Sequence, residues 1–166
     1  MSTSFTTDPT EIHTRRLVLR TWTSADLTAV RTGARRPGWA ADFPAAGDRE
    51  IAEVLVEASA GPDRSGHRIV TERLSGAAIG SIGLFRSPDD GVLELGYGIV
   101  PSYRGRGYAT EAATALAAHA FTAPGVHTVS ASVDLANPAS VRVLEKAGFA
   151  RFRIAGAQAE FRLTRR

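Results

Sequence analysis

The pattern of apolar and polar positions predicts that short strands and helices follow one another along the chain. Residues 16–22 are expected to form a first strand. Thr23 follows, with Asp26 three residues later, and this spacing resembles a capping box, in which each residue satisfies the backbone N–H of the other. A first helix is therefore expected from this point to about residue 33.

The rest of the chain continues the same mixture. Asp48 is suited to cap a second helix, because apolar residues recur at helical spacing after it until Gly61-Pro62. A third helix is expected over residues 107–121, and a fourth begins at Asn137. Further strands are expected where strand-forming residues are bounded by turn residues: 67–74, 77–85, 92–100, 128–133, 149–154 and 158–164.

These elements are expected to build one domain. The chain has 166 residues, of which 43% are hydrophobic and 22% charged, which is typical of a globular protein with one sizeable core. Residues 1–12 are polar and are expected to form a loose terminus, so the domain comprises residues 13–166. The expected class is α/β (α+β), a mixed and mostly antiparallel central sheet of about six to seven strands with about four helices.

Composition removes several classes of function. The sequence has no Cys, which excludes a disulfide scaffold, a Cys-ligated zinc site and a Cys nucleophile. Its four His show no metal-ligand spacing, so no metal is expected. The net charge is +3, but no basic run is interleaved with aromatic residues, so no nucleic acid is expected. The polar N-terminus lacks a signal core and no stretch is long enough to span a bilayer, so we expect a cytoplasmic protein without a membrane partner.

One turn carries a candidate anion site. Pro101 cannot donate a ladder hydrogen bond, so the strand before it should end there. Gly105 and Gly107 remove side chains where the backbone N–H groups at the start of the next helix would converge. Arg104 and Arg106 add positive charge nearby. The unit suits a diphosphate.

Three interpretations of this turn compete. The first is a plain turn with two glycines. The second is a dinucleotide-binding turn, but Thr110 stands where the third glycine belongs, and no acidic residue ends a following strand at about 20 residues. A phosphate-binding loop of the Walker type is excluded, because no Gly-Lys-Ser/Thr follows. The third interpretation is an acyl-CoA site.

The third interpretation is favoured by a family resemblance. Arg104-x-x-Gly107-x-Ala109 resembles the Gln/Arg-x-x-Gly-x-Gly/Ala signature of the GCN5-related N-acetyltransferases (GNAT). Further segments resemble the RimJ/RimL-like branch of that family, which modifies ribosomal protein N-termini, and the resemblance spans about residues 14–149. These segments are residues 14–20 (TRRLVLR), 94–97 (ELGY), 108–112 (YATEA) and 137–149 (NPASVRVLEKAGF).

The resemblance implies a fold and a cofactor site. Strands 92–100 and 128–133 would splay apart, and the pantetheine of acetyl-CoA would fill the gap and bond to main-chain groups near Ile99 and Val100. Lys146 is more simply explained as part of a charged helix face than as a contact of the CoA 3′-phosphate. The other cofactor-binding residues that the resemblance implies are Arg104, Gly105, Arg106, Gly107, Tyr108, Ala109, Thr110, Asn137 and Ser140.

The resemblance also implies two catalytic residues. In relatives, a Glu at the place of Glu94 often takes a proton from the acceptor amine, because a protonated amine cannot attack a thioester. An outward-facing Glu on a half-solvated strand is the simpler alternative. Ser140 is the candidate proton donor to the leaving thiolate, with Tyr97 or solvent as substitutes. Both Asn137 and Ser140 also have ordinary explanations as the cap and first turn of a helix.

The loop over residues 35–47 is expected to wall the acceptor site. It carries Trp39, Asp42 and Phe43, and an aromatic pair with a carboxylate suits an amine-bearing ligand. Alternatively, the two aromatic residues anchor the loop onto the core.

The expected function is transfer of an acetyl group from acetyl-CoA to a primary amine by direct attack in a ternary complex, the acceptor being a protein N-terminus or another peptide amine. Alternatives are a small-molecule amine acetyltransferase, for an antibiotic or a polyamine, and a CoA-binding protein without catalysis. The protein is expected to be a monomer or a homodimer.

Overall fold

The computed structural model describes residues 11–57 and 66–166, which form eight strands, four α-helices and a short 3-10 helix. The strands are β1 (Ile12–His13), β2 (Leu17–Thr21), β3 (His67–Glu72), β4 (Ala78–Arg86), β5 (Val92–Ile99), β6 (Thr128–Asp134), β7 (Ala150–Ala155) and β8 (Gln158–Thr164). The helices are α1 (Ser24–Thr32), α2 (Ala46–Glu57), η2 (Pro101–Tyr103), α3 (Tyr108–Ala120) and α4 (Pro138–Lys146).

All strands belong to one sheet, in the order β1-β2-β3-β4-β5-β6-β8-β7. Every pair is antiparallel except β5 and β6. The expected α/β fold with a mixed, mostly antiparallel sheet and four helices is therefore confirmed. The sheet has one strand more than expected, because Ile12 pairs with Leu19 within the segment expected to be loose. Residues 1–10 of that segment lie outside the described residues.

The two parallel strands diverge, as expected. β5 pairs with β6 only from Val92 to Glu94, opposite Thr128 to Ser130. On its other edge β5 stays paired with β4 as far as Ile99. The edge of β5 that faces β6 is therefore without a strand partner after Glu94, within the described residues. A strand edge with open N–H and C=O groups can bind an extended ligand as an added strand.

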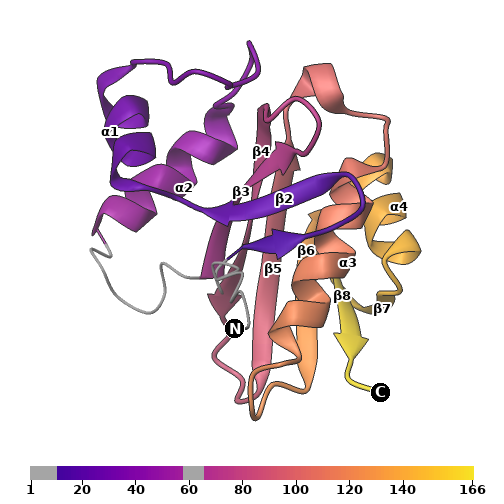
Figure 1. Ribbon diagram of the computed structural model, residues 1–166. Helices are drawn as coiled ribbons and strands as arrows, with labels where there is room; N and C mark the ends of the chain where they lie inside the picture. The colour runs from indigo at the N-terminus through magenta and orange to yellow at the C-terminus, as the bar shows by residue number, and fades with distance from the viewer. Residues whose placement is uncertain (1–10, 58–65) are drawn as a thin grey trace, which may run out of the picture.

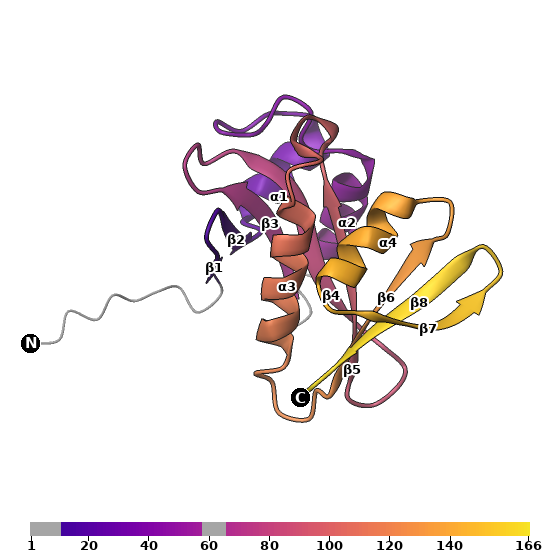
Figure 2. The same cartoon turned by 90° about the vertical axis from the view of Figure 1, so that its right-hand side faces the viewer.

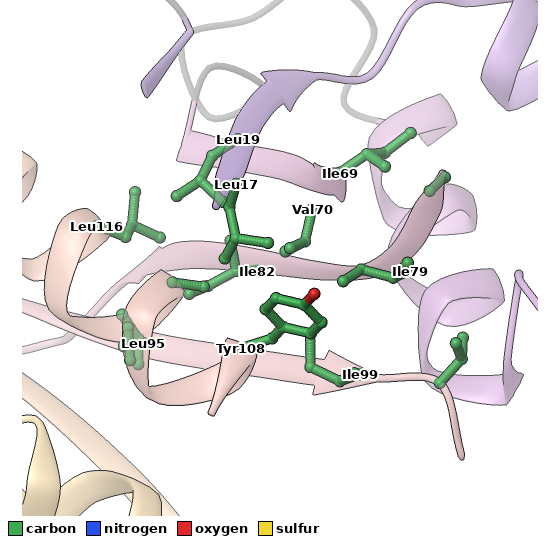
Figure 3. Packing of buried hydrophobic residues seen from close by; sticks show 14 of the residues in the cluster. Leu17, Leu19, Ile69, Val70, Ile79, Ile82, Leu95, Ile99, Tyr108 and Leu116 are labelled. Atoms are coloured by element: carbon green, nitrogen blue, oxygen red, sulfur yellow. The ribbon is translucent and has the colours of Figure 1, made fainter. Parts of the chain in front are cut away.

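The helices cover both faces of the sheet. Figure 1 shows α3 crossing in front of the strands with α4 beside it, while α1 and α2 are grouped together at the side of β2 to β4. Figure 2 shows the β7–β8 hairpin extending away from the two helix groups. Figure 3 shows Tyr108 and Leu116 of α3 against Ile82 and Leu95 of the central strands, all of them buried. Burial of this apolar layer fixes where α3, and hence the turn before it, lies on the sheet.

The starts of the first two helices follow the capping rules in different ways. At α1 the capping box of Thr23 and Asp26 is present as expected. At α2 the prediction is wrong in position: the helix begins at Ala46, so Asp48 lies inside its first turn. The Asp48 carboxylate reaches back and accepts the Ala45 N–H at 2.9 Å, which is the return half of a capping box. The expected end of this helix at Gly61-Pro62 lies outside the described residues.

Candidate active site

The turn between β5 and α3 leaves backbone N–H groups available to a ligand. Gly105 and Gly107 have φ angles of 77° and 80°, in the left-handed region that favours glycine. Gly107 is the N-cap of α3, and no side chain of the described residues caps the helix there. The first N–H groups of α3 and the positive end of its dipole therefore suit an anion.

A cavity of about 490 Å³ lies between this turn, the open edge of β5 and α4. Arg104, Arg142 and Lys146 contribute positive charge to its wall, and no acidic residue of the described chain lines it. Walls of one charge sign raise the local concentration of an oppositely charged ligand. The cavity brings together most of the expected cofactor residues: Ile99, Arg104, Gly105, Gly107, Tyr108, Ala109, Thr110, Asn137 and Ser140.

Val100 differs from the expectation. Its side chain is fully buried, and its N–H donates to the Ile79 carbonyl at 2.8 Å, on the β4 side. Because N–H groups alternate between the two edges of an antiparallel strand, the open edge belongs to Tyr97 and Ile99 instead. Both of these residues line the cavity. The main-chain contact expected at Val100 is thus reassigned to Tyr97.

The two arginines of the turn have different positions. Arg104 lines the cavity, and its Nε donates to the Ile99 carbonyl at 2.7 Å, which braces the turn against the end of β5. Arg106 is not among the residues that line the cavity in the described chain. Its guanidinium lies 4.9 Å from the ring centroid of Tyr103. Arg104 is therefore the better placed of the two for a phosphate.

Three side chains meet where α4 approaches β5. The Asn137 Oδ1 accepts the Ser140 N–H at 3.2 Å, so Asn137 is the N-cap of α4 as expected. The hydroxyl groups of Tyr97 and Ser140 are 2.6 Å apart. Burial raises the pKa of the Tyr97 phenol above its ordinary value, although the hydrogen bond with Ser140 opposes the shift. Both hydroxyl groups therefore keep their protons at neutral pH, and the pair can donate a proton to a group bound in the cavity.

Side chains from distant segments hold the turn in place. The Glu111 carboxylate accepts hydrogen bonds from the Thr14 hydroxyl and from the backbone N–H and Nε of Arg16. Arg16 in turn donates through Nη1 to the Arg106 carbonyl at 2.8 Å, and its guanidinium lies 4.4 Å from the ring centroid of Tyr108. Residues just before β2 thereby fix both the turn and the first turn of α3.

A second cavity of about 310 Å³ lies on the other side of β5. Both cavities are lined by Tyr97, Gly98, Ile99 and Arg104. The strand segment from Tyr97 to Ile99 therefore separates them. The second cavity lies against the first turn of α2, where Asp48 is the acidic residue in its wall among the described residues. The other residues of its wall are Ala45, Gly47, Ile51, Ser81, Ile82, Gly83, Phe85 and Gly96.

Glu94 lies at the point where β5 and β6 separate. It is the last residue of β5 that pairs with β6, and it pairs with Phe85 of β4 on the other side. Because side chains alternate along a strand, Glu94 shares a face with Gly96 and Gly98, which line the second cavity. Its side chain is exposed and lies outside the walls of both cavities as described. An exposed carboxylate at this position can exchange protons with water.

The match to a family model decides the family. Residues 16–150 match the model of the acetyltransferase (GNAT) domain. The chain belongs to the GNAT family. Membership of the GNAT family implies acyl transfer, and GNAT domains use acetyl-CoA. A search of curated proteins found no match to the chain.

Solved structures share the GNAT fold over almost the whole chain. An acetyltransferase from Agrobacterium tumefaciens has a TM-score of 0.68 and 26% identity, covering 93% of this chain and 94% of its own. A candidate ribosomal-protein-serine acetyltransferase from Vibrio cholerae has a TM-score of 0.67 and 22% identity, covering 93% and 97%. A chimeric spermidine N-acetyltransferase, derived in part from Vibrio cholerae, has a TM-score of 0.64 and 20% identity, covering 90% and 95%.

The first cavity of this GNAT protein fits acetyl-CoA. The uncapped start of α3 and the left-handed turn at Gly105 and Gly107 match a pyrophosphate. The open edge at Tyr97 and Ile99 matches the amides of pantetheine. The positive charges of Arg104, Arg142 and Lys146 in the cavity wall match the negative charge of the phosphate groups of CoA.

The loop expected to wall the acceptor site has a different role for each of its three residues. Phe43 is fully buried and Trp39 is 9% exposed, and their ring centroids are 5.2 Å apart in an edge-to-face contact. As folded, neither ring lines either of the two cavities described. Asp42 accepts hydrogen bonds from the N–H and hydroxyl of Ser102, so it ties the loop to η2. The positions of Trp39 and Phe43 therefore agree with the alternative in which both aromatic residues anchor the loop onto the core.

The structure adds cavity residues that the sequence reasoning did not assign. Arg142 and Lys146 lie one turn apart on α4 and both line the first cavity. Their spacing of four residues was visible, but it does not say which face of the helix meets the cofactor. Asp48 was predicted only as a helix cap and proves also to line the second cavity.

Two further observations concern what the described residues contain. None of the helices within residues 11–57 and 66–166 is long and apolar enough to cross a bilayer. The same residues hold no group of three or more His, Asp and Glu side chains that could bind a metal ion.

Proposed function

We propose that this protein is an N-acetyltransferase that moves an acetyl group from acetyl-CoA to a primary amine by direct attack in a ternary complex. One observation carries the proposal: the segment from Tyr97 to Ile99 separates a cation-lined cavity from a second cavity that holds a carboxylate. An anionic donor and a cationic acceptor can therefore approach the same strand from its two sides. Direct transfer needs this arrangement, because it requires both reactants to be held together.

The residues of the first cavity would hold the cofactor. The N–H groups after Gly107 and the Arg104 side chain would bind the pyrophosphate, with Arg142 and Lys146 near the outer phosphate. The open edge of β5 at Tyr97 and Ile99 would pair with pantetheine. When bound, acetyl-CoA supplies a thioester whose carbonyl carbon can accept an amine.

Glu94 is proposed as the base. An α-amino group has a pKa of about 8, so most of it is protonated near neutral pH and must lose a proton before it attacks. Glu94 lies beyond Gly96 on the face of β5 that lines the second cavity, and its carboxylate is exposed to water. It can take a proton from the amine, directly or through water, and release it to solvent.

Ser140 is proposed as the proton donor to the leaving thiolate, with Tyr97 behind it. Their hydroxyl groups are 2.6 Å apart and both residues line the cofactor cavity. After Ser140 gives up its proton, the Tyr97 phenol can replace it through the same hydrogen bond. The hydrogen bond supports this pairing of roles, since each hydroxyl can act as donor or acceptor.

The acceptor has to be inferred from this chain. Two solved structures of similar fold are described by different acceptors, a ribosomal protein and spermidine, at 22% and 20% identity. The segments that resemble the RimJ/RimL-like branch support a peptide α-amino group as one acceptor to test beside small amines. The chemistry common to all of them is a primary amine.

Thiol release tests the proposal. The purified protein is first titrated with CoA by calorimetry and then incubated with acetyl-CoA and a panel of N-terminal peptides, polyamines, aminoglycosides and simple alkylamines. We expect CoA binding and amine-dependent release of thiol with at least one class. Absence of CoA binding would refute the function, and binding without turnover on any amine would favour a CoA-binding protein without catalysis.

Replacement of Glu94 by Gln tests the base within the same assay. We expect kcat to fall by about two orders of magnitude near neutral pH, the usual contribution of a positioned base, with CoA affinity unchanged. The loss should shrink as the pH approaches the pKa of the amine, because the neutral amine then forms without help. Glu53→Gln is the control, an exposed Glu on α2 outside both cavities. Equal turnover of the Glu94 variant and this control at every pH would remove Glu94 as the base.

A further inference from the structure

Asp48 is a buried carboxylate without an ion-pair partner in the described part of the chain, although the charge of the neighbouring Arg49 acts on it from the exposed side of α2. Its side chain accepts hydrogen bonds from the Ser81 hydroxyl and from the Ala45 N–H, and the residue is 4% exposed. It forms no ion pair with another residue in the described part of the chain. Burial of a charge is costly unless an opposite charge and hydrogen bonds compensate for it. A cationic ligand would supply the missing compensation.

The surroundings of Asp48 favour a ligand from the second cavity. Asp48 lines that cavity, and the charged residue that shares the wall, Arg104, is bonded to the Ile99 carbonyl. Burial raises the pKa of Asp48, while the hydrogen bond from Ser81 opposes the shift. A buried carboxylate that lines a cavity and has only neutral hydrogen-bond partners is a candidate position for a cationic ligand.

The position of Asp48 relative to β5 is set by the sheet. Ser81, which binds Asp48, pairs directly with Gly98 across β4 and β5. Gly98 lines both cavities, and a Cβ added to it would meet no atom within 4 Å. An ammonium group held by Asp48 therefore lies next to the open strand segment that faces the cofactor on its other side.

We propose that Asp48 binds the ammonium group of the acceptor, and that the acceptor is a compact primary amine with one positive charge and an apolar skeleton. This inference rests on the proposed function and names the acceptor class. The remaining walls of the cavity include the apolar residues Ile51 and Phe85, which suit carbon rather than a second charge. A volume of about 310 Å³ is at the low end for a ligand site and suits a small acceptor.

A structural role of Asp48 can be separated from ligand binding. In Asp48→Asn, the amide oxygen still accepts the Ala45 N–H, and the amide NH₂ can donate to the Ser81 hydroxyl. The variant thus keeps the cap and the bond to β4 but loses the negative charge. Glu53→Gln, on the exposed face of the same helix, removes one negative charge outside the cavity and is the matched control.

The test compares these variants with benzylamine, n-butylamine, spermidine and a short N-terminal peptide as acceptors. For the two monoamines, the KM of Asp48→Asn should rise about tenfold to a hundredfold, the range for loss of one charge-assisted contact, while kcat changes less than about threefold. Calorimetry with the monoamines in the presence of CoA should show the same loss of affinity. The affinity for CoA should stay at the wild-type value and the melting temperature should not fall, and every constant of Glu53→Gln should stay at the wild-type value.

The outcomes distinguish this inference from the proposed function. If the wild-type protein turns over monoamines and Asp48→Asn leaves their KM and dissociation constants unchanged, Asp48 does not bind the acceptor. If the wild type turns over spermidine or the peptide well and the monoamines poorly, the compact acceptor class is wrong. If the wild type binds no CoA, the proposed function itself fails.

Discussion

At the scale of single residues, Gly98 shows how an absent side chain opens the site. It lies in the strand segment that separates the two cavities, it is exposed, and an added Cβ would meet no atom within 4 Å. Gly80, its diagonal neighbour on β4, is the opposite case: an added Cβ would lie 2.1 Å from the Gly98 carbonyl oxygen. One glycine leaves space for ligands, and the other allows two strands to approach.

Gly98→Val should therefore separate function from stability. We expect its melting temperature to stay within a few degrees of wild type, because β-branched residues suit strands and the new side chain enters open space. Turnover should fall more than about tenfold, since the side chain would occupy the space between donor and acceptor. Gly80→Ala should do the reverse and lower the stability by about 2 kcal/mol through a backbone clash. Thermal unfolding and thiol release measure both effects, and a stable Gly98→Val with full activity would contradict this account of the site.

At the same scale, the sequence predicted residues whose roles follow from local chemistry. Gly105 and Gly107, with the helix after them, were recognisable as an anion turn because the whole unit is contiguous. The bond between Tyr97 and Ser140 was not, because the two residues are 43 positions apart and meet only after α4 packs near β5. Asp48 was assigned to capping alone, since the cavity beside it is formed by strands far along the chain.

At the scale of elements, the first turn of α3 depends on the segment just before β2. Arg16 bonds to Glu111 of α3 at 2.8 Å and to the Arg106 carbonyl at 2.8 Å. Burial opposes ionisation of Glu111, but the hydrogen bonds from Thr14 and Arg16 outweigh it, so its pKa lies below the ordinary value. The phosphate turn is thus held in shape by contacts that touch no ligand.

Arg16→Gln should weaken the cofactor site through this contact. We expect the dissociation constant for CoA to rise about fivefold, equivalent to one hydrogen bond of about 1 kcal/mol that no longer holds the turn. Turnover at saturating acetyl-CoA should change less than about twofold, because Arg16 touches neither cavity. Arg15→Gln, the exposed neighbour, is the control. Calorimetry measures the affinity; an unchanged CoA affinity in Arg16→Gln would show that the contact serves stability alone.

Elements were easier to predict than their partners. The helices and strands followed from periodicity and caps, which are local, and most of their bounds lie within a few residues of those observed. The divergence of β5 from β6 after Glu94 came only from the family resemblance, because strand pairing depends on contacts between distant segments. The same limit explains why β1 was missed: two residues, Ile12 and His13, carry no period of their own.

At the scale of the whole molecule, two buried carboxylates affect stability in opposite directions. Burial alone would raise the pKa of Asp26, but its hydrogen bonds with Arg20 and Thr23 outweigh that effect and lower it. Arg36 also pairs with Asp26 at 2.9 Å. The hydrogen-bond partners of Asp48 are neutral, and burial raises its pKa against the opposing effects of these bonds and of the Arg49 charge. Folding thus favours the ionised form of Asp26 and the protonated form of Asp48.

The pH dependence of unfolding should show this difference in the Asp→Asn variants. A carboxyl group in the unfolded chain has a pKa of about 4. The stabilisation from Asp26 is present above that pKa and is lost as the pH falls through the lower folded value. Asp26→Asn should therefore cost about 2 kcal/mol near neutral pH and progressively less below about pH 4.

Asp48→Asn should behave in the opposite way. Below the unfolded pKa, Asp48 is protonated in both states and carries no penalty, whereas at higher pH the folded protein must bury the charge. The variant should equal or exceed wild type in stability near neutral pH, and its advantage should disappear towards about pH 4. Urea unfolding of both variants and of wild type between about pH 4 and pH 8 measures the free energies. A loss of stability in Asp48→Asn that is present near neutral pH and shrinks towards about pH 4 would mean that the ionised carboxylate is needed by the fold, and the charge would then be retained for structure instead of for an amine.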